Sequence, residues 1–318
     1  MFGVAYAFAV TMIGTTLPTP LYPIYESRIH FSTLIVTVVF AAYGFAVLAT
    51  LVLIGPLSDR YGRRRMLLPG LALAAASSIV FLLAHSLGML FLGRVLSGFS
   101  AGVFTVTATV ALLELAPPEE RGRATLLATL VNIGGLGIGP VLAGVLAEVG
   151  PDPLRLPYAV HLALLLPAVP AILLMPETVS SASSGDGHGP APEFRLSVPA
   201  EVRGTFVRAA AAAFAAFATL GLFSAVSPSF LGRLLHLPNH ALIGAVASLC
   251  FIASAVGQIE LDRFPARRAF PIGCWLMVVG MALIAGALAA ESLALLLAGA
   301  AVSGFGNGLS FRAGLSAI

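Results

Sequence analysis

Residues 55–65 read Gly55-Pro56-Leu57-Ser58-Asp59-Arg60-Tyr61-Gly62-Arg63-Arg64-Arg65, and they follow directly on an apolar run over 32–55. As a helix, such a run is long enough to cross the roughly 30 Å hydrocarbon core of a bilayer. The segment after it is polar and rich in arginine, so it is predicted to lie in water at the membrane surface. These residues therefore predict a polytopic membrane protein.

Composition and further apolar runs agree with this prediction. The 318 residues are 58% hydrophobic and only 10% charged, whereas roughly a quarter of the residues in a soluble globular protein are charged. The sequence predicts an all-α membrane protein with ten spans. Their expected limits are 3–24, 32–55, 66–86, 88–113, 122–147, 157–175, 204–231, 240–261, 269–288 and 292–315.

The arginines predict the orientation of these spans. All seventeen basic side chains are arginine, and with the N-terminus in the cytoplasm twelve of them fall in cytoplasmic segments and three in outer loops. The remaining two, Arg94 and Arg312, lie inside predicted spans. Because positive charge is retained on the cytoplasmic side during insertion, we expect a multi-pass protein of the inner (plasma) membrane with a cytoplasmic N-terminus.

The chain also contains an internal repeat. A second copy of the arginine-rich segment follows the eighth span, and the fourth and tenth spans share a second pattern. Six spans separate the copies, so both run in the same membrane direction, which is a parallel repeat. We expect a bundle over 1–176, a polar cytoplasmic linker over 177–203, and a second bundle over 204–318. The repeated stretches are Gly257-Gln258-Ile259-Glu260-Leu261-Asp262-Arg263-Phe264-Pro265-Ala266-Arg267-Arg268 for the first pattern, and Ser97-Gly98-Phe99-Ser100-Ala101-Gly102 with Ser303-Gly304-Phe305-Gly306-Asn307-Gly308 for the second.

In these residues the chain resembles the major facilitator superfamily (MFS), and the pattern over 55–65 is specific to it. The resemblance implies an MFS fold, in which two six-helix bundles related as parallel repeats surround a central cavity and move small solutes by alternating access. Members of the family have twelve spans. The chain ends after the tenth predicted span, so we expect a C-terminally incomplete second bundle that lacks its last two helices.

The arginine-rich segments are predicted to form a gating loop on the cytoplasmic side. From the residues alone, an acid near a helix start is favoured by the helix dipole or pairs with a nearby arginine. The resemblance implies that this loop latches the bundles in the outward-facing state and that its acid contacts the start of an eleventh span. The predicted loop residues are Gly55, Asp59, Arg60, Gly62, Arg63 and Arg64, with Asp262, Arg263 and Arg268 from the second copy.

Two further patterns concern energy coupling. Arg94 lies in the fourth span, where a charge is costly unless it faces water or a partner, so it marks a pathway or else snorkels to the outer surface. The resemblance associates Arg94 and Gly98 with a proton pathway. In the fifth span Gly135, Gly139, Pro140 and Gly144 predict a kinked, closely packed helix. That pattern resembles the motif of proton-coupled antiporters, notably drug exporters.

The solute cavity is predicted from proline interruptions in corresponding spans of the two halves, which point to a binding region, although proline near a span's end also simply terminates it. The resemblance places cavity walls on the first, fourth, seventh and tenth spans. The predicted cavity residues are Thr15, Pro20, Tyr22, Ser227, Pro228, Asn307 and Arg312.

Several functions are not indicated by the sequence. Cys250 and Cys274 are the only cysteines, and they form no spaced set of metal ligands. We identify no catalytic residue, no phosphate loop and no basic stripe for nucleic acid, so neither an enzyme nor a cofactor is expected. No acid lies in the middle of a span, so a coupling proton would use a missing span, a terminal acid or a histidine such as His161, which is otherwise a packed, hydrogen-bonded residue.

Taken together, the sequence predicts a secondary active transporter that exports small amphiphilic or drug-like molecules, driven by the proton gradient. Its expected partners are a small-molecule solute and the lipid bilayer, and its oligomeric state is open. Two alternatives remain at this point: a sugar or metabolite importer of the same superfamily, and a truncated membrane protein that transports nothing.

Overall fold

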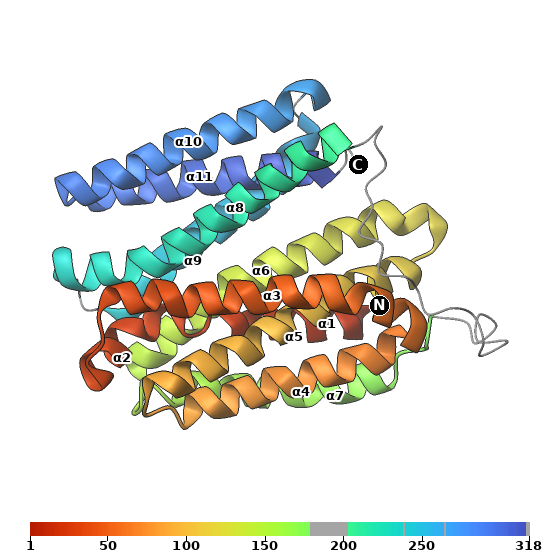
Figure 1. Cartoon of the computed structure of the whole chain (residues 1–318), viewed down its shortest axis with the longest axis horizontal. Coiled ribbons are helices and arrows are strands. Elements are labelled where there is room, and N and C mark those ends of the chain that lie inside the picture. The colour runs from red at the N-terminus through yellow and green to blue at the C-terminus, as the bar shows by residue number, and fades with distance from the viewer. Residues whose placement is uncertain (179–202, 238, 264, 316–318) are drawn as a thin grey trace. The chain divides into compact units, whose positions relative to one another are not determined.

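The computed structural model describes residues 1–178, 203–237, 239–263 and 265–315, and within these ranges it contains helices and no strand (Figure 1). This confirms the predicted all-α class. The elements are α1 (Phe2–Thr16), η1 (Thr19–Leu21), α2 (Tyr22–Ile29), α3 (Thr33–Tyr61), α4 (Arg63–Leu82), α5 (Leu87–Glu114), η2 (Pro118–Glu120), α6 (Arg121–Val149), α7 (Leu156–Leu173), α8 (Arg203–Ser229), the π-helical turn η4 (Phe230–Leu234), α9 (His240–Ile259), η5 (Glu260–Arg263), α10 (Ala266–Ala290) and α11 (Leu293–Leu315).

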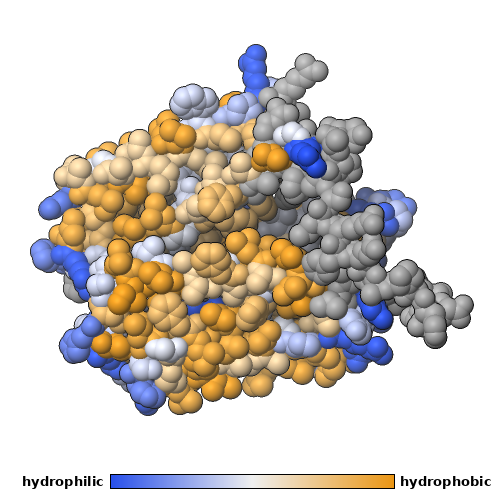
Figure 2. Space-filling model, viewed as in Figure 1, coloured by the Kyte–Doolittle hydropathy of each residue, from blue (hydrophilic) through white to orange (hydrophobic). Residues whose placement is uncertain are grey.

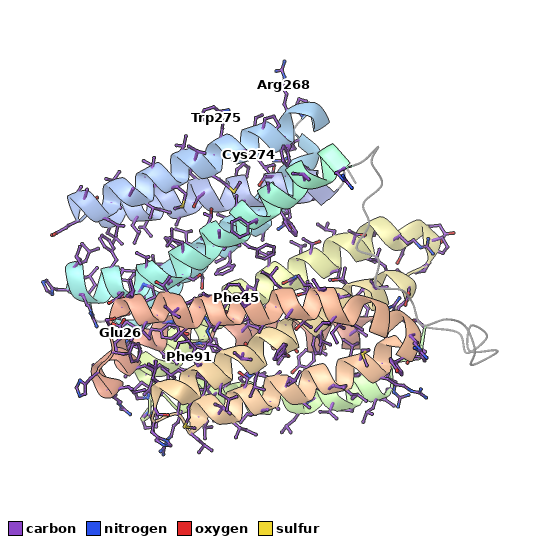
Figure 3. The ribbon with its side chains drawn as sticks, in the orientation of Figure 1. Glu26, Phe45, Phe91, Arg268, Cys274 and Trp275 are labelled. Atoms are coloured by element: carbon purple, nitrogen blue, oxygen red, sulfur yellow. The ribbon has the colours of Figure 1, made fainter. Side chains whose placement is uncertain are left out.

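Ten of the described helical segments are long and apolar enough to cross a membrane, which confirms the ten predicted spans. Helices are the expected solution, because lipid offers no hydrogen-bond partners and a helix satisfies its own backbone groups. Large apolar side chains cover much of the outside: Phe45 is 72% exposed and Trp275 is 70% exposed. Figure 2 shows such hydrophobic residues spread over the face in view, and Figure 3 shows Trp275 pointing away from α10.

The first span differs from its prediction because it is interrupted. Instead of one helix over 3–24, α1 ends at Thr16, the short turn η1 follows, and α2 continues to Ile29. Pro18, Pro20 and Pro23 lie at this interruption, and each lacks the N–H that a continuous helix needs. The span then ends at His30, whose φ of 60° places it in the left-handed region typical of a helix C-terminus.

The second span also extends beyond its prediction. The helix α3 continues to Tyr61, so most of the arginine-rich segment that was expected to be a loop is helical. The break occurs at Gly62, whose φ of +97° is a conformation that other residues rarely adopt. The predicted gating loop is therefore a single tight turn between α3 and α4. The surroundings of Gly55 and the side chain of Asp59 lie outside what the structure describes.

The helices divide into two compact units. Unit 1 contains the described residues of 1–16, 38–135 and 154–178; unit 2 contains those of 17–37, 136–153 and from 203 onward. Unit 1 thus holds α1, α4, α5 and α7 with most of α3, and unit 2 holds α2 and α8–α11 with the second half of α6. The division into a bundle over 1–176 and another over 204–318 stays a prediction.

Glycines set the distance between helices inside each unit. In unit 2 a Cβ at Gly304 of α11 would overlap the carbonyl oxygen of Cys250 in α9, and one at Gly308 would overlap that of Ser254. In unit 1 a Cβ at Gly98 of α5 would lie 2.6 Å from the carbonyl oxygen of Tyr43 in α3. Small residues at these positions let two backbones touch. The contact of the fourth span with the second therefore corresponds to the contact of the tenth span with the eighth. A parallel repeat leads us to expect this correspondence.

Gly308→Ala should destabilise the protein by about 1–3 kcal/mol, because the added methyl group overlaps the α9 backbone, which cannot move aside as a side chain would. The measurement is the thermal unfolding midpoint of the purified protein in detergent. Gly286→Ala is the matched control, since a Cβ there meets nothing within 4 Å. Equal midpoints for the two variants would contradict the backbone contact between α9 and α11.

Candidate functional site

A network of charged side chains is centred on Arg63, the first residue of α4. Its Nε and Nη2 donate to the two carboxylate oxygens of Glu114, at 3.2 and 2.9 Å, and its Nη1 donates to Ser58 Oγ at 2.9 Å. Such a two-pronged arginine–carboxylate contact fixes both direction and distance. Arg63 is only 6% exposed, so Glu114 at the end of α5 supplies the charge that its burial requires.

Glu177, which follows α7, joins the same network through the backbone. Its Oε1 accepts a hydrogen bond of 2.7 Å from the Arg63 N–H, so its negative charge lies at the N-terminus of α4, where the helix dipole favours it. A Cβ at Gly62 would lie 2.6 Å from this carboxylate, which is a second reason for glycine at the turn. The Thr178 hydroxyl donates to Glu114 and closes the network.

Sequence reasoning placed Gly62 and Arg63 in the gating segment but missed Glu114, Glu177 and Thr178. The three belong to segments 51 or more residues away from Arg63, and sequence pattern alone does not report such contacts. A signal was present, because Glu114 and Glu177 each follow an apolar span closely, as the arginines do.

The other predicted gating residues are not gathered into this network. Arg60 lies over the ring of Tyr61, with 5.7 Å between its Cζ and the ring centroid, and Arg64 is half-buried at the start of α4. Arg263 pairs with Glu260 one turn away and is exposed. Arg268 is exposed and points away from α10 (Figure 3). The side chain of Asp262 lies outside the described ones.

Arg94 lies in the interior of unit 1. Its side chain is 1% exposed, and Nη1 donates to the carbonyl oxygen of Thr15 in α1. Its Cζ lies 4.3 Å from the ring centroid of Phe40 and 5.1 Å from that of Tyr43, both in α3. Aromatic faces and a carbonyl dipole stabilise a guanidinium away from water. Of the two interpretations of Arg94, this geometry excludes snorkelling to the surface.

A small polar cavity lies beside Arg94 in unit 1. His161 of α7 forms its wall: Nε2 lies 3.0 Å from the Val10 carbonyl oxygen, and Nδ1 lies 2.7 Å from Ser78 Oγ. A carbonyl only accepts, so Nε2 carries a proton, whereas the Ser78 hydroxyl can donate to Nδ1 or accept from it. Both ring nitrogens of His161 therefore have hydrogen-bond partners. The cavity is lined by Thr11, Gly14, Thr15, Ala74, Ser77, Ser78, Ser97, Ser100 and His161.

The predicted cavity residues fall in several places. Thr15 lines the small cavity of unit 1. Asn307 lies in unit 2, where its amide donates to the Ala216 carbonyl at 2.7 Å and accepts from Ser254 at 3.0 Å, so it joins three helices. Arg312 donates to the carbonyl oxygen of Gln258. Four others are buried in unit 2, two at the interruption of the first span and two near the end of the seventh span: Pro20, Tyr22, Ser227 and Pro228. Their role as one solute cavity stays a prediction.

The glycines of the fifth span make close contacts in both units. In unit 1 a Cβ at Gly135 would lie 2.6 Å from Met12 Cβ of α1. In unit 2 a Cβ at Gly144 would overlap the His240 carbonyl, and one at Gly244 of α9 would overlap the Pro140 carbonyl. Gly139, which lies between Gly135 and Gly144 in the sequence, is buried. The second half of α6 and α9 therefore touch backbone to backbone.

Metal-binding chemistry is not indicated by the part of the chain that the structure describes. Among those residues no three His, Cys, Asp or Glu side chains lie together as metal ligands would. Cys250 is buried, Cys274 is half-buried, and both are free thiols.

Comparison with known proteins identifies a family over nearly the whole chain and curated relatives over about half of it. The sequence profile of the Major Facilitator Superfamily matches residues 4–318. Multidrug resistance protein 2 of Bacillus subtilis is 27% identical over 172 residues, which cover 54% of this chain and 42% of that protein. Quinolone resistance protein NorA of Staphylococcus aureus is 25% identical over 174 residues, which cover 54% of this chain and 44% of that protein. The match thus spans less than half the length of these curated relatives.

A solved structure shares the fold. The chain is similar to a bacterial homologue of the human lysosomal transporter Spinster, crystallised in an inward-facing and occupied conformation, with a TM-score of 0.72. The two are 16% identical, and the superposition covers 98% of this chain and 72% of that one.

Glu114→Ala should lower stability by about 1–3 kcal/mol, because it removes the two hydrogen bonds that the Glu114 carboxylate accepts from the buried Arg63. The unfolding midpoint in detergent measures this. Glu120→Ala is the matched control: Glu120 is half-exposed and 4.0 Å from Arg123, and a surface pair contributes at most about 1 kcal/mol. Equal losses in the two variants would show that the Arg63 network contributes no more than a surface ion pair.

Gly14→Ala should displace the His161 ring, because a Cβ at Gly14 would overlap it. The expected result is a loss of roughly 1–3 kcal/mol of stability and a changed imidazole signal in the NMR spectrum of histidine-labelled protein. Gly134→Ala is the control, since a Cβ there meets nothing within 4 Å. An unchanged imidazole signal in Gly14→Ala would contradict the packing described for His161.

Proposed function

Because the chain belongs to the Major Facilitator Superfamily, we propose that it is a secondary active transporter that exports small amphiphilic or drug-like molecules in exchange for protons. The family is made of transporters, which agrees with the expectation that this protein is not an enzyme. The proposal concerns the direction, the solute class and the coupling ion.

The observation that carries the proposal is the buried charge of Arg94. Its side chain is 1% exposed, Nη1 donates to the Thr15 carbonyl oxygen, and the guanidinium lies over the rings of Phe40 and Tyr43. A cation kept inside a membrane span at such a cost marks a functional route. In the family that the sequence resembles, the arginine at this position is associated with proton coupling, and we propose that role for Arg94.

Two further observations support export. The backbone contact between Gly144 of α6 and α9 uses the glycine-rich pattern that resembles the antiporter motif. The names of two relatives describe them as a multidrug resistance protein and a quinolone resistance protein. Both observations favour exchange of drug-like solutes over uptake of a nutrient.

The proposed location follows from the arginines. We propose a multi-pass protein of the plasma membrane in which the Arg63 end of the helices faces the cytoplasm, because positive charge is retained there. The Arg28 and Arg233 end would then face outward. A small-molecule solute and the bilayer are the proposed partners, and the proton gradient is the proposed energy source.

Transport into proteoliposomes tests this function. With an acidic lumen, ethidium or a fluoroquinolone should accumulate inside as protons leave, and collapsing the pH gradient with an ionophore should abolish the accumulation. Arg94→Ala should reduce the gradient-driven rate by about tenfold or more, since a charge in the coupling route is lost. The exposed Arg121 supplies the control variant Arg121→Ala, which should keep the wild-type rate.

Two results would count against the proposal. Accumulation that is equal with and without the pH gradient would exclude proton exchange. Uptake of a sugar driven by an acidic outside, without any movement of dye or quinolone, would support an importer instead.

A further inference from the structure

An apolar groove lies on the outside of unit 1 between α4 and α7, two helices that are in contact side by side (Figure 1). Its volume is about 540 Å³, which falls within the roughly 300–1,000 Å³ typical of ligand pockets. Every residue that lines the groove is leucine, alanine or valine. These side chains offer no hydrogen bond, so the groove suits a hydrocarbon and not water.

The groove opens toward the surroundings of the protein. Its floor contains Leu71 and Leu165, which are buried, and its rim contains Leu166, which is 71% exposed. Alanines on both helices, Ala72 and Ala163, leave the hollow open because their side chains are short. An unfilled hollow forfeits van der Waals contact along its lining. Because α4 and α7 are membrane spans, a flexible acyl chain of the bilayer can restore that contact.

Two arginines lie at one end of the groove. Arg64 and Arg65 precede the lining residue Leu68 by four and three positions in α4. Residues at these spacings share one face of a helix, and helical side chains are tilted toward the N-terminus of their helix. Arg64 is half-buried and Arg65 is exposed. Both charges therefore lie where the groove meets the membrane surface.

These two charges are not neutralised within the part of the chain that the structure describes. None of the ion pairs among those residues includes Arg64 or Arg65. The nearby acids instead bind Arg63: Glu114 accepts from its guanidinium, and Glu177 accepts from its backbone N–H. An anion from outside the chain can therefore pair with Arg64 and Arg65.

The distance between the arginines and the far end of the groove matches one leaflet of a bilayer. At a rise of about 1.5 Å per residue, Ala75 lies roughly 16 Å beyond Arg64 along α4. Half of a hydrocarbon core of roughly 30 Å is about 15 Å. A lipid with its phosphate at Arg64 would thus have its acyl chain beside the groove down to the middle of the membrane.

We propose that this groove, together with Arg64 and Arg65, is a binding site for one anionic phospholipid. Its acyl chain lies in the groove, and its phosphate accepts hydrogen bonds from the two guanidinium groups, which suit phosphate well. A second copy of the chain would have to supply both an apolar ridge and an acid at the right depth, whereas an anionic phospholipid carries both in one molecule. The inference requires only that the helices span a membrane, and it is independent of solute, direction and coupling ion.

Quenching of tryptophan fluorescence by brominated lipid tests the site. Trp275 is the only tryptophan, so Leu166→Trp combined with Trp275→Phe places a single tryptophan at the groove. The protein is reconstituted in phosphatidylcholine vesicles in which a small fixed fraction is brominated phosphatidylglycerol or, in a second sample, brominated phosphatidylcholine. We expect a preference of about tenfold for the phosphatidylglycerol, equivalent to about 1.4 kcal/mol, because basic side chains at the surface attract anionic lipids.

Removing the arginines should abolish this preference. With Arg64→Gln and Arg65→Gln together, the two brominated lipids should quench equally. The matched control is Arg121→Gln with Arg123→Gln, which removes two exposed arginines at the start of α6 and should keep the preference. Loss of the preference in both double variants would overturn the proposal, since it would mean that surface charge in general attracts the lipid.

Filling the groove should lower the preference while both arginines remain. Ala75→Leu adds volume to a residue that lines the groove. Ala76→Leu is the control, because Ala76 is also half-buried but is not among the lining residues. Equal preferences in these two variants would show that the arginines attract the lipid without the groove, and would contradict the site.

Trp275 of the unaltered chain reports on ordinary surrounding lipid. It is 70% exposed on α10, which does not line the groove, and should be quenched equally by both lipids. Three outcomes would overturn the proposal: equal quenching by both lipids at position 166, the same preference at Trp275, or weak quenching by both lipids at position 166. The last result would mean that another protein chain covers the groove.

Discussion

Backbone contact between helices at glycine is the constraint on which the rest of the structure depends. Lipid is as apolar as leucine, so apolar side chains alone give helices in a membrane little reason to associate. Here Gly98 lets α5 meet α3, Gly144 lets α6 meet α9, and Gly304 with Gly308 lets α11 meet α9. The contact between α9 and α11 also brings polar side chains within hydrogen-bonding distance, because Ser254 donates to Asn307 across the two helices.

Buried charged side chains also connect neighbouring helices. Arg63, Arg94 and Glu26 are each at most 6% exposed, and each is held by a group from another helix. Such contacts add little net stability, because desolvation offsets most of the attraction. These contacts are specific in geometry, however, and breaking such a contact leaves a buried charge that is stable only in contact with water. Ion pairs at helix ends and a cation in the interior therefore suit a protein that changes conformation, which is the behaviour proposed for this transporter.

The sequence predicted the helical class, ten spans and the resemblance to the family, because hydrophobic length and arginine placement are local properties. The glycines of the fourth and fifth spans were also visible as a spacing. The partners of the charged side chains were not visible in the sequence. Arg63 pairs with Glu114, 51 positions away, and Glu26 pairs with Arg233, 207 positions away. The helical course of residues 55–61 was missed because a polar, arginine-rich stretch favours a loop, whereas Gly62 alone ends the helix. The prolines of the first span indicated that it is interrupted, but nothing in the sequence indicated that α2 continues to Ile29.

We propose that the two ends of this transporter open in turn, as alternating access in its family implies. Distances measured by pulsed electron paramagnetic resonance check this proposal. The spin labels are placed on exposed residues: Ser27 with His236 for the end predicted to face outward, and Arg65 with Arg263 for the end predicted to face the cytoplasm. We expect two populations whose distances change in opposite directions, so that acidification or added quinolone lengthens the distance in one pair while the distance in the other shortens. A single unchanged distribution at both ends, or lengthening of both pairs together, would contradict it.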